Sequence, residues 1–291
     1  MVLPLFRTGS LIAPTAPQLP VAPKQYDQSA TDKFSNVLRL YFNQLDNFNQ
    51  LFTTNTGGGL LKFPNGAFHQ DGYTTLSANM TNTSTAAIQV ASTADFLSAG
   101  ALIIGSEIVK YTGKTATTFT GITRGAYGST NVAHTAGVYV SEAQPVPSPT
   151  SALTIALTKT DTSNQVELDP LDNTKVVLAI AGYYNIQFSV QLLTFDNTID
   201  NVTMWFRQNG VDVPNSAGIA TVPSIHGGSP GTAIISWNIV LPFNKDDYLQ
   251  LLMASDTGNT VAATYPPGTA PVHPSSPSII LTATFVSALY T

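Results

Sequence analysis

Apolar and polar residues alternate strictly along several segments in the second half of the chain. The longest of these is 181–194, AGYYNIQFSVQLLT. Its apolar residues of one parity, separated by Asn, Gln and Ser, are Tyr184, Ile186, Phe188, Val190 and Leu192. A period of two residues is typical of an antiparallel strand that buries one face. The segment therefore predicts a half-buried strand at the centre of a sheet.

Shorter alternating segments accompany this strand and are separated by turn residues. Residues 202–207 lead into Asn209 and Gly210, a dipeptide that favours a type I′ hairpin turn. Residues 235–241 and 278–286 have the same period of two. About eight strands without a helix over residues 152–291 predict a jelly-roll β-sandwich.

One segment, residues 27–52, has a helical period instead. Its apolar residues recur at alternating spacings of four and three, and Asp27 or Ser29 is the expected N-cap. The heptad seam consists of Phe34, Leu38, Tyr41, Leu45, Phe48 and Phe52. We expect the seam to join subunits, with a homotrimer as the predicted state. A helix that lies on the core of its own domain is the alternative.

The other segments complete the expected domain organisation of a mainly β protein. Residues 1–25 mix proline with apolar residues, which predicts an extended arm that orders on a partner; a disordered tail is the alternative. Short apolar runs separated by glycine, with Gly105 and Ser106 as a hairpin turn, predict a small β barrel or sandwich. The predicted parts are an anchor arm at 1–25, an oligomerising helix at 26–57, a small β module at 58–143, a stiff proline-rich linker at 144–151 and a jelly-roll head domain at 152–291.

The composition narrows the classes of partner. Charged residues make up 10% of the chain, against about 25% in an average protein, which suits a chain that hides surface in an assembly. The net charge of −5 and the lack of a Lys/Arg run argue against a nucleic-acid partner. No apolar run approaches the roughly 18 residues that cross a bilayer, so no membrane insertion is expected, and the N-terminus lacks the pattern of a signal peptide. Cysteine is absent, which excludes disulfides and thiolate chemistry.

The sequence contains few residue patterns that could bind a metal ion. The histidines, which lie far apart in the sequence, are His69, His134, His226 and His273. We therefore expect no histidine metal site and no cofactor. Asp196 with Asp200, and Asp246 with Asp247, are candidate oxygen ligands for calcium, but turn formation is their expected role.

Catalytic motifs are not expected either. Arg124 lies in TRGAYGS, which lacks the Gly-Lys-Ser/Thr element of a phosphate-binding loop, and we expect it to pair with Glu107 or with backbone carbonyls. We predict no serine nucleophile elbow and no pair of catalytic carboxylates. We therefore expect that this protein is not an enzyme.

Four residues are candidates for surface recognition. Trp205 and Arg207 share the polar parity of their strand, where an aromatic ring beside an arginine can stack on a sugar or pack on a protein. Contact between subunits is the plainer interpretation. His226 and His273 lie in segments 222–232 and 256–277, which are too long for hairpin turns and too polar for a core. Such loops suit recognition, with packing against neighbouring subunits as the alternative.

Three groups of motifs resemble virion proteins of tailed phages. GSEIVKYTG, TRGAYGST and AHTAG, within residues 86–141, resemble a unit that recurs in such proteins, particularly marine ones. AGYYNIQFSVQL, VTMWFRQNGVDVPNS and PSIILTATFV, within residues 175–286, resemble the trimeric jelly-roll heads of phage fibres, which are similar to C1q and tumour necrosis factor. The pattern YDQ…LRLYFNQLDN, within residues 26–52, is similar to the opening of marine phage structural proteins.

The resemblance implies a structural protein of the virion. Such a protein is a homotrimeric tail-fibre or adaptor-like protein that contacts other virion proteins, on the tail or capsid, through its arm and helix. It displays a jelly-roll head, for which a host surface glycan or protein is a candidate partner. A capsid decoration or head-fibre protein is the alternative in the same class. A glycan-degrading tail spike is the alternative in another class.

Overall fold

The computed structural model is mainly β, with 48% of its residues in strands and 8% in helix. This confirms the predicted mainly β class. The chain divides into two compact units, Met1–Phe63 and Pro64–Thr291, and each is described by itself. The structure describes residues 15–53, 63–146, 149–269 and 271–289, with the backbone alone at 50–53.

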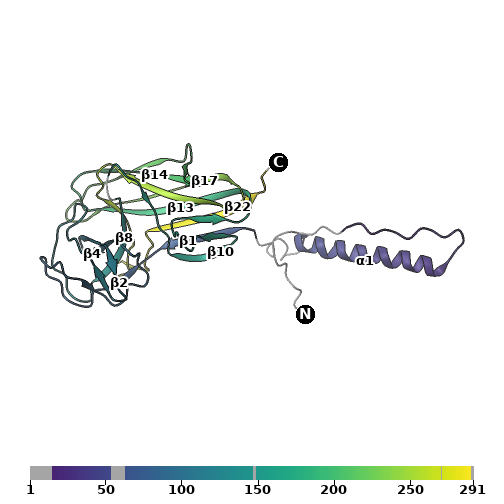
Figure 1. Cartoon of the computed structure of the whole chain (residues 1–291), viewed down its shortest axis with the longest axis horizontal. Helices are drawn as coiled ribbons and strands as arrows, with labels where there is room; N and C mark the ends of the chain where they lie inside the picture. Colours follow the sequence, from purple (N-terminus) through teal and green to yellow (C-terminus); the bar gives the residue numbers. More distant parts are fainter. Residues whose placement is uncertain (1–14, 54–62, 147–148, 270, 290–291) are drawn as a thin grey trace. The chain divides into compact units, whose positions relative to one another are not determined.

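The first unit contains the predicted helix. α1 runs from Gln28 to Thr53, one residue later at each end than expected. Asp27 is its cap: the side-chain Oδ1 accepts a hydrogen bond from Ser29 N at 2.9 Å, and the carbonyl accepts one from Thr31 N at 3.1 Å. Residues 15–26 run alongside α1 without regular secondary structure (Figure 1). Most of the predicted arm, residues 1–14, lies outside the described residues.

The second unit is built on two large sheets. The first is organised around β13 (Gly182–Thr194), whose residues alternate between buried and outward positions over most of its length. β17 (Gly231–Phe243) pairs with β13 along its whole length, and β22 (Ile279–Ser287) pairs with the opposite edge. β1 (Asn65–Gln70) and β10 (Lys159–Asn164) follow β22, which gives the order β10-β1-β22-β13-β17.

The second sheet has the order β11-β12-β18-β14-β16, with antiparallel pairing throughout. The hairpin β14–β15 turns at Asn209 and Gly210, whose φ angles of +50° and +81° fit the predicted type I′ turn. Two short strands, β9 and β15, pair with β18 and β14. The strands are β9 (Leu153–Thr154), β11 (Val166–Leu168), β12 (Val176–Leu178), β14 (Asp200–Gln208), β15 (Val211–Asp212), β16 (Gly218–Val222) and β18 (Asp247–Ser255).

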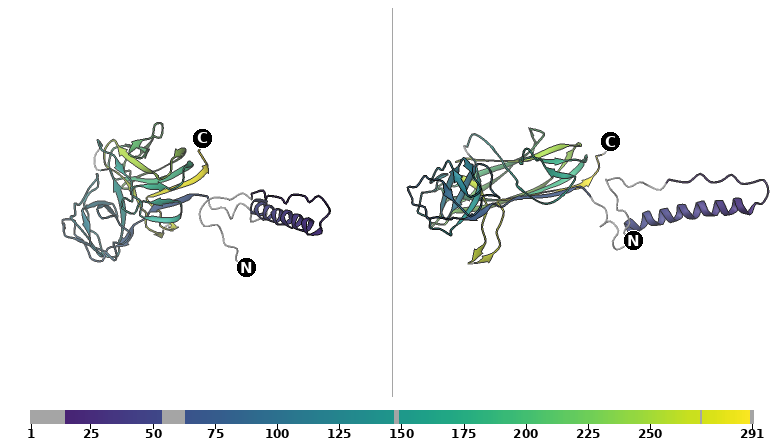
Figure 2. Two further views of the ribbon diagram at one scale, coloured as in Figure 1. Left: turned by 45° about the vertical axis from the view of Figure 1, so that its right-hand side comes forward. Right: turned by 60° about the horizontal axis from the view of Figure 1, so that its bottom comes forward.

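The inward faces of these sheets share one hydrophobic core, and Figure 2 shows the two layers. Phe188 on β13 meets Phe206 on β14 and Trp237 on β17, with ring centroids 5.5 and 4.4 Å apart. Edge-on aromatic contacts of this kind stabilise a core beyond the area that they bury. All five apolar residues predicted to face inward from β13 are buried, which confirms the parity read from the sequence.

Residues 71–146 form a smaller β region at one end of the sandwich (Figure 1). It has its own hydrophobic core, and the Gly105-Ser106 turn joins β4 to β5 as predicted. β8 pairs with β2 and β4, while β3, β7 and β6 form a separate small sheet. The strands are β2 (Tyr73–Thr75), β3 (Ile88–Gln89), β4 (Gly100–Ile104), β5 (Glu107–Tyr111), β6 (Gly113–Lys114), β7 (Thr118–Thr120) and β8 (Tyr139–Pro145).

Strand pairing crosses the boundary that the sequence places between module and head. β1 belongs to the main sheet of the sandwich, and β8 pairs with β19 (Thr260–Ala263). Gln144, assigned to the linker from the sequence, is buried in β8 and exchanges two hydrogen bonds of 2.8 Å with the backbone of Ala156. The proline spacing predicted an extended spacer, but extended backbone also fits a sheet wherever a neighbouring strand is available.

A hairpin interrupts the sheet between β19 and β22. These two strands lie end to end along one edge of β13. Between them the chain leaves the sheet as the hairpin of β20 (Gly268–Thr269) and β21 (Val272–His273), which projects in the right-hand view of Figure 2. We call residues 264–269 and 271–277 the finger.

Candidate functional site

The main surface feature of the first unit is the heptad seam of α1. None of the described residues 15–49 is buried. Phe34 keeps 39% of its surface exposed, and the next four seam residues are half-buried. Phe52 lies in the last turn, where only the backbone is described. The described seam side chains are therefore only partly covered by the rest of the unit.

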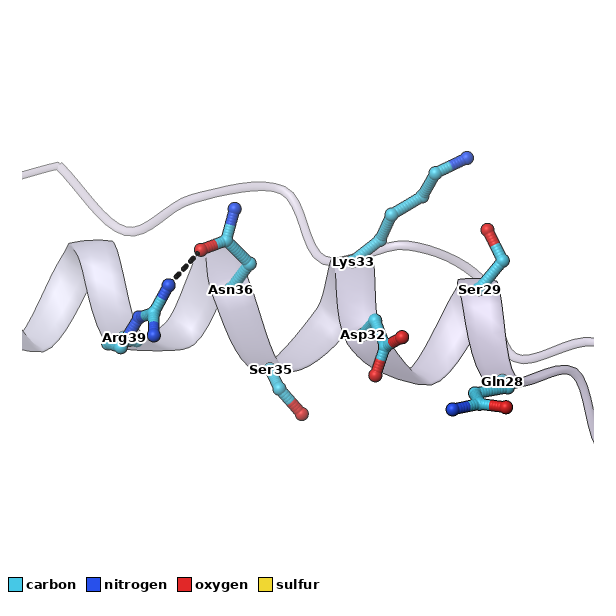
Figure 3. Close-up of a pocket in the computed structure, with 7 residues that line it drawn as sticks. All are labelled: Gln28, Ser29, Asp32, Lys33, Ser35, Asn36 and Arg39. Atoms are coloured by element: carbon cyan, nitrogen blue, oxygen red, sulfur yellow. Dashed lines mark hydrogen bonds between the residues drawn. The ribbon is translucent and has the colours of Figure 1, made fainter.

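The start of α1 carries a polar depression (Figure 3). Arg39 Nη2 donates a hydrogen bond to Asn36 Oδ1 at 2.8 Å within it. The lining residues, all from one helix, are Gln28, Ser29, Asp32, Lys33, Ser35, Asn36 and Arg39. A single helix face cannot surround a ligand as binding pockets do, so this depression is a solvated polar surface.

The outward side of the first sheet is unusual because its three longest strands present no charged side chain among the described residues. Amides and hydroxyls lie in rows across the strands, and exposed apolar residues such as Ile234 (68%) and Val286 (56%) lie among them. Depletion of charge is typical of the centre of a protein interface. We call these side chains the uncharged face: Tyr183, Asn185, Gln187, Ser189, Gln191, Thr232, Ile234, Ser236, Asn238, Val240, Pro242, Ile280, Thr282, Thr284 and Val286.

Trp205 and Arg207 lie on the outward side of the second sheet, where both are half-buried. Arg207 Nε donates a hydrogen bond to Asp212 Oδ1 at 2.7 Å, and this hydrogen bond lowers the pKa of Asp212. The side chain of Trp205, next to Arg207 on the same side, adds to the lowering of the Asp212 pKa. Arg207 is thus already engaged within the chain.

The other two predicted recognition residues lie on separate elements. His226 is exposed in the turn before β17, where its backbone N–H and C=O pair with those of Ser229 at 3.0 Å. His273 is exposed on β21, and its Nδ1 donates to the carbonyl of Pro274 at 2.8 Å. The four candidates are therefore divided among three elements and do not converge on one ligand position.

The turn that contains His226 also includes GGSPG at residues 227–231, which matches the letters of a Gly-x-Ser-x-Gly motif. A nucleophile elbow requires a strand, a sharp turn and a helix. Here the segment leads into β17, and Ser229 is exposed. Gly227 and Gly228 have φ angles of +57° and +82°, so the glycines serve the turn.

A buried ion pair organises the end region. Glu107 is fully buried, and Arg124 donates to its two carboxylate oxygens at 2.5 and 2.7 Å. His134 Nε2 lies 2.8 Å from Oε2 of the same carboxylate. Burial alone would raise the pKa of Glu107, but the hydrogen bonds from Arg124 and His134 outweigh burial and lower the pKa. The predicted pairing of Arg124 with Glu107 is confirmed.

Arg124 also joins segments that are distant in the sequence. Its remaining N–H groups donate to the carbonyls of Thr81, Ser84 and Val132 at 2.6–3.1 Å. A guanidinium offers five donors in a fixed plane, so one side chain can satisfy all of these acceptors. The sequence indicated the partner of Arg124 but not the contribution of His134, because nothing local marks their proximity.

A second buried carboxylate, Glu142 on β8, was not foreseen from the sequence. Leu97 N donates to its Oε1 at 2.7 Å, the Gln70 amide donates to its Oε2, and the Tyr111 hydroxyl lies 3.5 Å from Oε1. Burial raises the pKa of Glu142 to about 8. Because Gln70 belongs to β1 and Leu97 to the end region, this carboxyl group lies where the two regions meet.

We predict that Glu142→Gln removes a pH dependence of stability. The carboxyl binds its proton more tightly in the folded chain, so its stabilisation is full below the ordinary pKa of 4.5 and is lost as the pH rises through about 8. Relative to the variant, the wild-type free energy of unfolding should fall by about 1.4 kcal/mol per pH unit in this interval. Urea unfolding across the interval measures the slope. Glu167→Gln, which removes an exposed carboxylate, should retain the wild-type slope, and a retained slope in Glu142→Gln would contradict the prediction.

Three of the four aspartates considered as calcium ligands accept hydrogen bonds, and the fourth, Asp246, lies 3.7 Å from Lys245 Nζ. Asp196 accepts from Asn259 and Thr198, and Asp200 accepts from Thr260 Oγ1 at 2.5 Å. Asp247 accepts from the side chains of Gln208 and Asn209 and from the backbone of Asn244 at 2.7–3.0 Å. These hydrogen bonds stabilise turns. The described residues contain no cluster of three or more His, Asp or Glu residues suited to a metal ion.

Two further findings bear on the class of protein. Within the described residues, no helix is both long and apolar enough to cross a membrane. No protein-family model matches the sequence, and a comparison with curated proteins found no match.

Proposed function

We propose that this chain is a non-enzymatic structural protein of a phage virion. In this proposal it is a homotrimeric fibre- or adaptor-type protein, attached through its N-terminal arm and helix and displaying a jelly-roll head. The virion assignment rests on the resemblance of its motifs to tailed-phage proteins. The trimer rests chiefly on α1, whose heptad seam finds no buried environment among residues 15–49. Helices of this kind gain most of their stability from packing against other helices.

The connectivity of the sandwich supports a jelly-roll head. After β13 in the first sheet, the chain forms β14 and β16 in the second, returns to the first as β17, crosses again as β18 and ends in the first as β22. In the first sheet, neighbouring strands such as β1 and β22 come from distant parts of the chain. Crossings of this type are the Greek-key connections that define jelly rolls.

The uncharged face supports assembly of the head itself. The chain has few charges, and the outward positions of β13, β17 and β22 include none of them. Burying such a face requires no ion to lose its hydration, so association releases water from apolar surface at little electrostatic cost. We assign this face to contacts between heads and the seam of α1 to contacts between helices.

The non-enzymatic assignment is supported by the positions of the polar groups. Glu107, Arg124 and Glu142 are enclosed and engaged in hydrogen bonds that join segments of the fold. The exposed histidines, His226 and His273, lie on separate elements, a turn before β17 and the strand β21. Loops such as 222–232 are the proposed sites of host contact, because a rigid sheet fixes their ends while their tips remain exposed.

A density map of the intact phage particle that encodes this chain tests the proposal. We expect the chain at a threefold position with its arm and α1 at the attachment point and its sandwich outermost. Threefold density on the capsid surface rather than the tail would favour the decoration protein. Absence of the chain from purified particles would overturn the virion assignment. Release of reducing ends from host polysaccharide by the purified chain would favour a glycan-degrading enzyme.

A further inference from the structure

The finger rises from the uncharged face. Gln191 points outward from β13, and its side-chain amide donates to the carbonyl of Pro277 at 2.9 Å and to the hydroxyl of Ser276. The root is closed by two backbone hydrogen bonds between Tyr265 and Ser276, of 2.9 and 2.8 Å. An outward-facing residue thus anchors the finger, so the hairpin leaves the sheet on that side.

The outer part of the finger has little support from its own chain. β20 and β21 contain two residues each, and Val272 is 87% exposed. A two-stranded hairpin of this length is marginal in water. Residues 264–277 include no Asp, Glu, Lys or Arg, so the finger has the same uncharged chemistry as the face from which it rises.

A hollow with matching chemistry lies beside the root of the finger. Its lining includes Gln191, Thr232, Ile234 and Tyr265. Ile234 is 68% exposed there, so it offers an apolar contact for a side chain that enters from outside.

A projecting finger prevents two uncharged faces from meeting flat against each other. In a closed ring of three copies, however, each copy can present one surface to the next and receive a different surface from the previous copy. We propose that the finger is an intersubunit clasp, in which the finger of each copy packs on the uncharged face of the next, with Val272 against Ile234 at the hollow. This inference rests on the proposed homotrimer and assigns its head contacts.

The first test compares two substitutions of exposed apolar residues in the full-length chain. Val272→Asp places a charge without a partner in the clasp, so we expect the trimer to dissociate at a concentration at least about tenfold higher than the wild type. Leu171→Asp is the matched control, because Leu171 is 96% exposed on a loop at the other sheet, and it should behave as wild type. Sedimentation velocity over a dilution series measures both. A Val272→Asp trimer as stable as the wild type overturns the clasp.

The second test locates the contact with thiols, since the natural chain contains no cysteine. Differently tagged chains that carry Val272→Cys or Ile234→Cys are mixed during assembly and oxidised. We expect a disulfide-linked pair that contains both tags, and none when Leu171→Cys replaces Ile234→Cys. A trimer that forms without the mixed disulfide overturns the clasp and leaves the proposed function standing. A wild-type chain that is monomeric overturns both.

Discussion

Replacing Leu38 and Leu45 with Asp should convert the proposed trimer into monomers while the sandwich stays folded. Both residues lie in the heptad seam of α1 and are half-buried within a single chain. Packing against neighbouring helices stabilises a Leu side chain by roughly 1.5–3 kcal/mol, and the new carboxylates would be buried without partners. Each copy carries both changes, so the loss is repeated around the bundle. The sandwich has its own core and should retain its β-sheet signal.

Sedimentation and circular dichroism on the same samples separate loss of assembly from loss of fold. Leu40→Asp is the matched control, because Leu40 is 53% exposed on the same helix but lies away from the seam. We expect this variant to sediment as wild type. Dissociation by both variants alike would indicate that the introduced charge, rather than the seam, is responsible. A trimer that survives the double substitution would contradict the role of the seam.

Arg124→Ala should be the most destabilising single substitution that we propose in the second unit. It leaves Glu107 buried with His134 and two backbone N–H groups as its only described partners, and it frees three carbonyls. Removing one partner of a buried ion pair costs about 3–5 kcal/mol. That is a large share of the ~5–15 kcal/mol that stabilises a typical domain. Thermal unfolding, followed by circular dichroism, measures the loss.

Arg207→Ala supplies the matched control for this prediction. Arg207 and Asp212 also pair at 2.7 Å, but their side chains are 31% and 55% exposed. Exposed pairs contribute about 0–1 kcal/mol, so this variant should unfold close to the wild type. Arg124→Lys should recover only part of the loss, because one ammonium cannot reach both carboxylate oxygens and three carbonyls. Equal stability of the two Ala variants would show that the buried hydrogen bonds of Arg124 do not stabilise the fold more than the exposed pair does.

The sequence predicted the strands best where one face is buried and the other is solvated. β13 combines five buried apolar residues with outward amides and hydroxyls, so its period of two is unmistakable. Turns were equally well predicted where backbone geometry demands particular residues, as at Asn209 and Gly210. α1 was located within one residue because its heptad spacing and the Asp27 cap act over short distances.

Features that depend on distant partners were not predictable in the same way. β1 falls within the small module predicted at 58–143, yet it pairs with β10 and β22 across the predicted boundary. The sequence predicts a loop at the finger, because only the tertiary fold reveals that β19 and β22 pair with the same edge of β13. Both pairings lack a local signal in the sequence, because they join segments that are far apart in the chain.

The candidate site residues also differ in whether a local signal in the sequence reveals their contacts. Arg124 could be paired with Glu107 because a glycine-rich turn brings an arginine back towards a nearby hairpin. Glu142 carries no such signal: one acidic residue in a short strand reads as solvent-exposed, whereas Gln70 and Leu97 enclose it. Trp205 and Arg207 were placed on the correct outward side, but their engagement within the chain depends on the neighbouring β15.

Sedimentation equilibrium of the chain at micromolar concentration measures directly whether this protein is a homotrimer. We expect a single species with three times the 30.8 kDa mass of one chain. That mass should persist on moderate dilution and be lost in the Leu38→Asp/Leu45→Asp variant. A wild-type species of 30.8 kDa throughout the concentration range would show that the protein is a monomer, with the seam of α1 and the uncharged face both exposed to water.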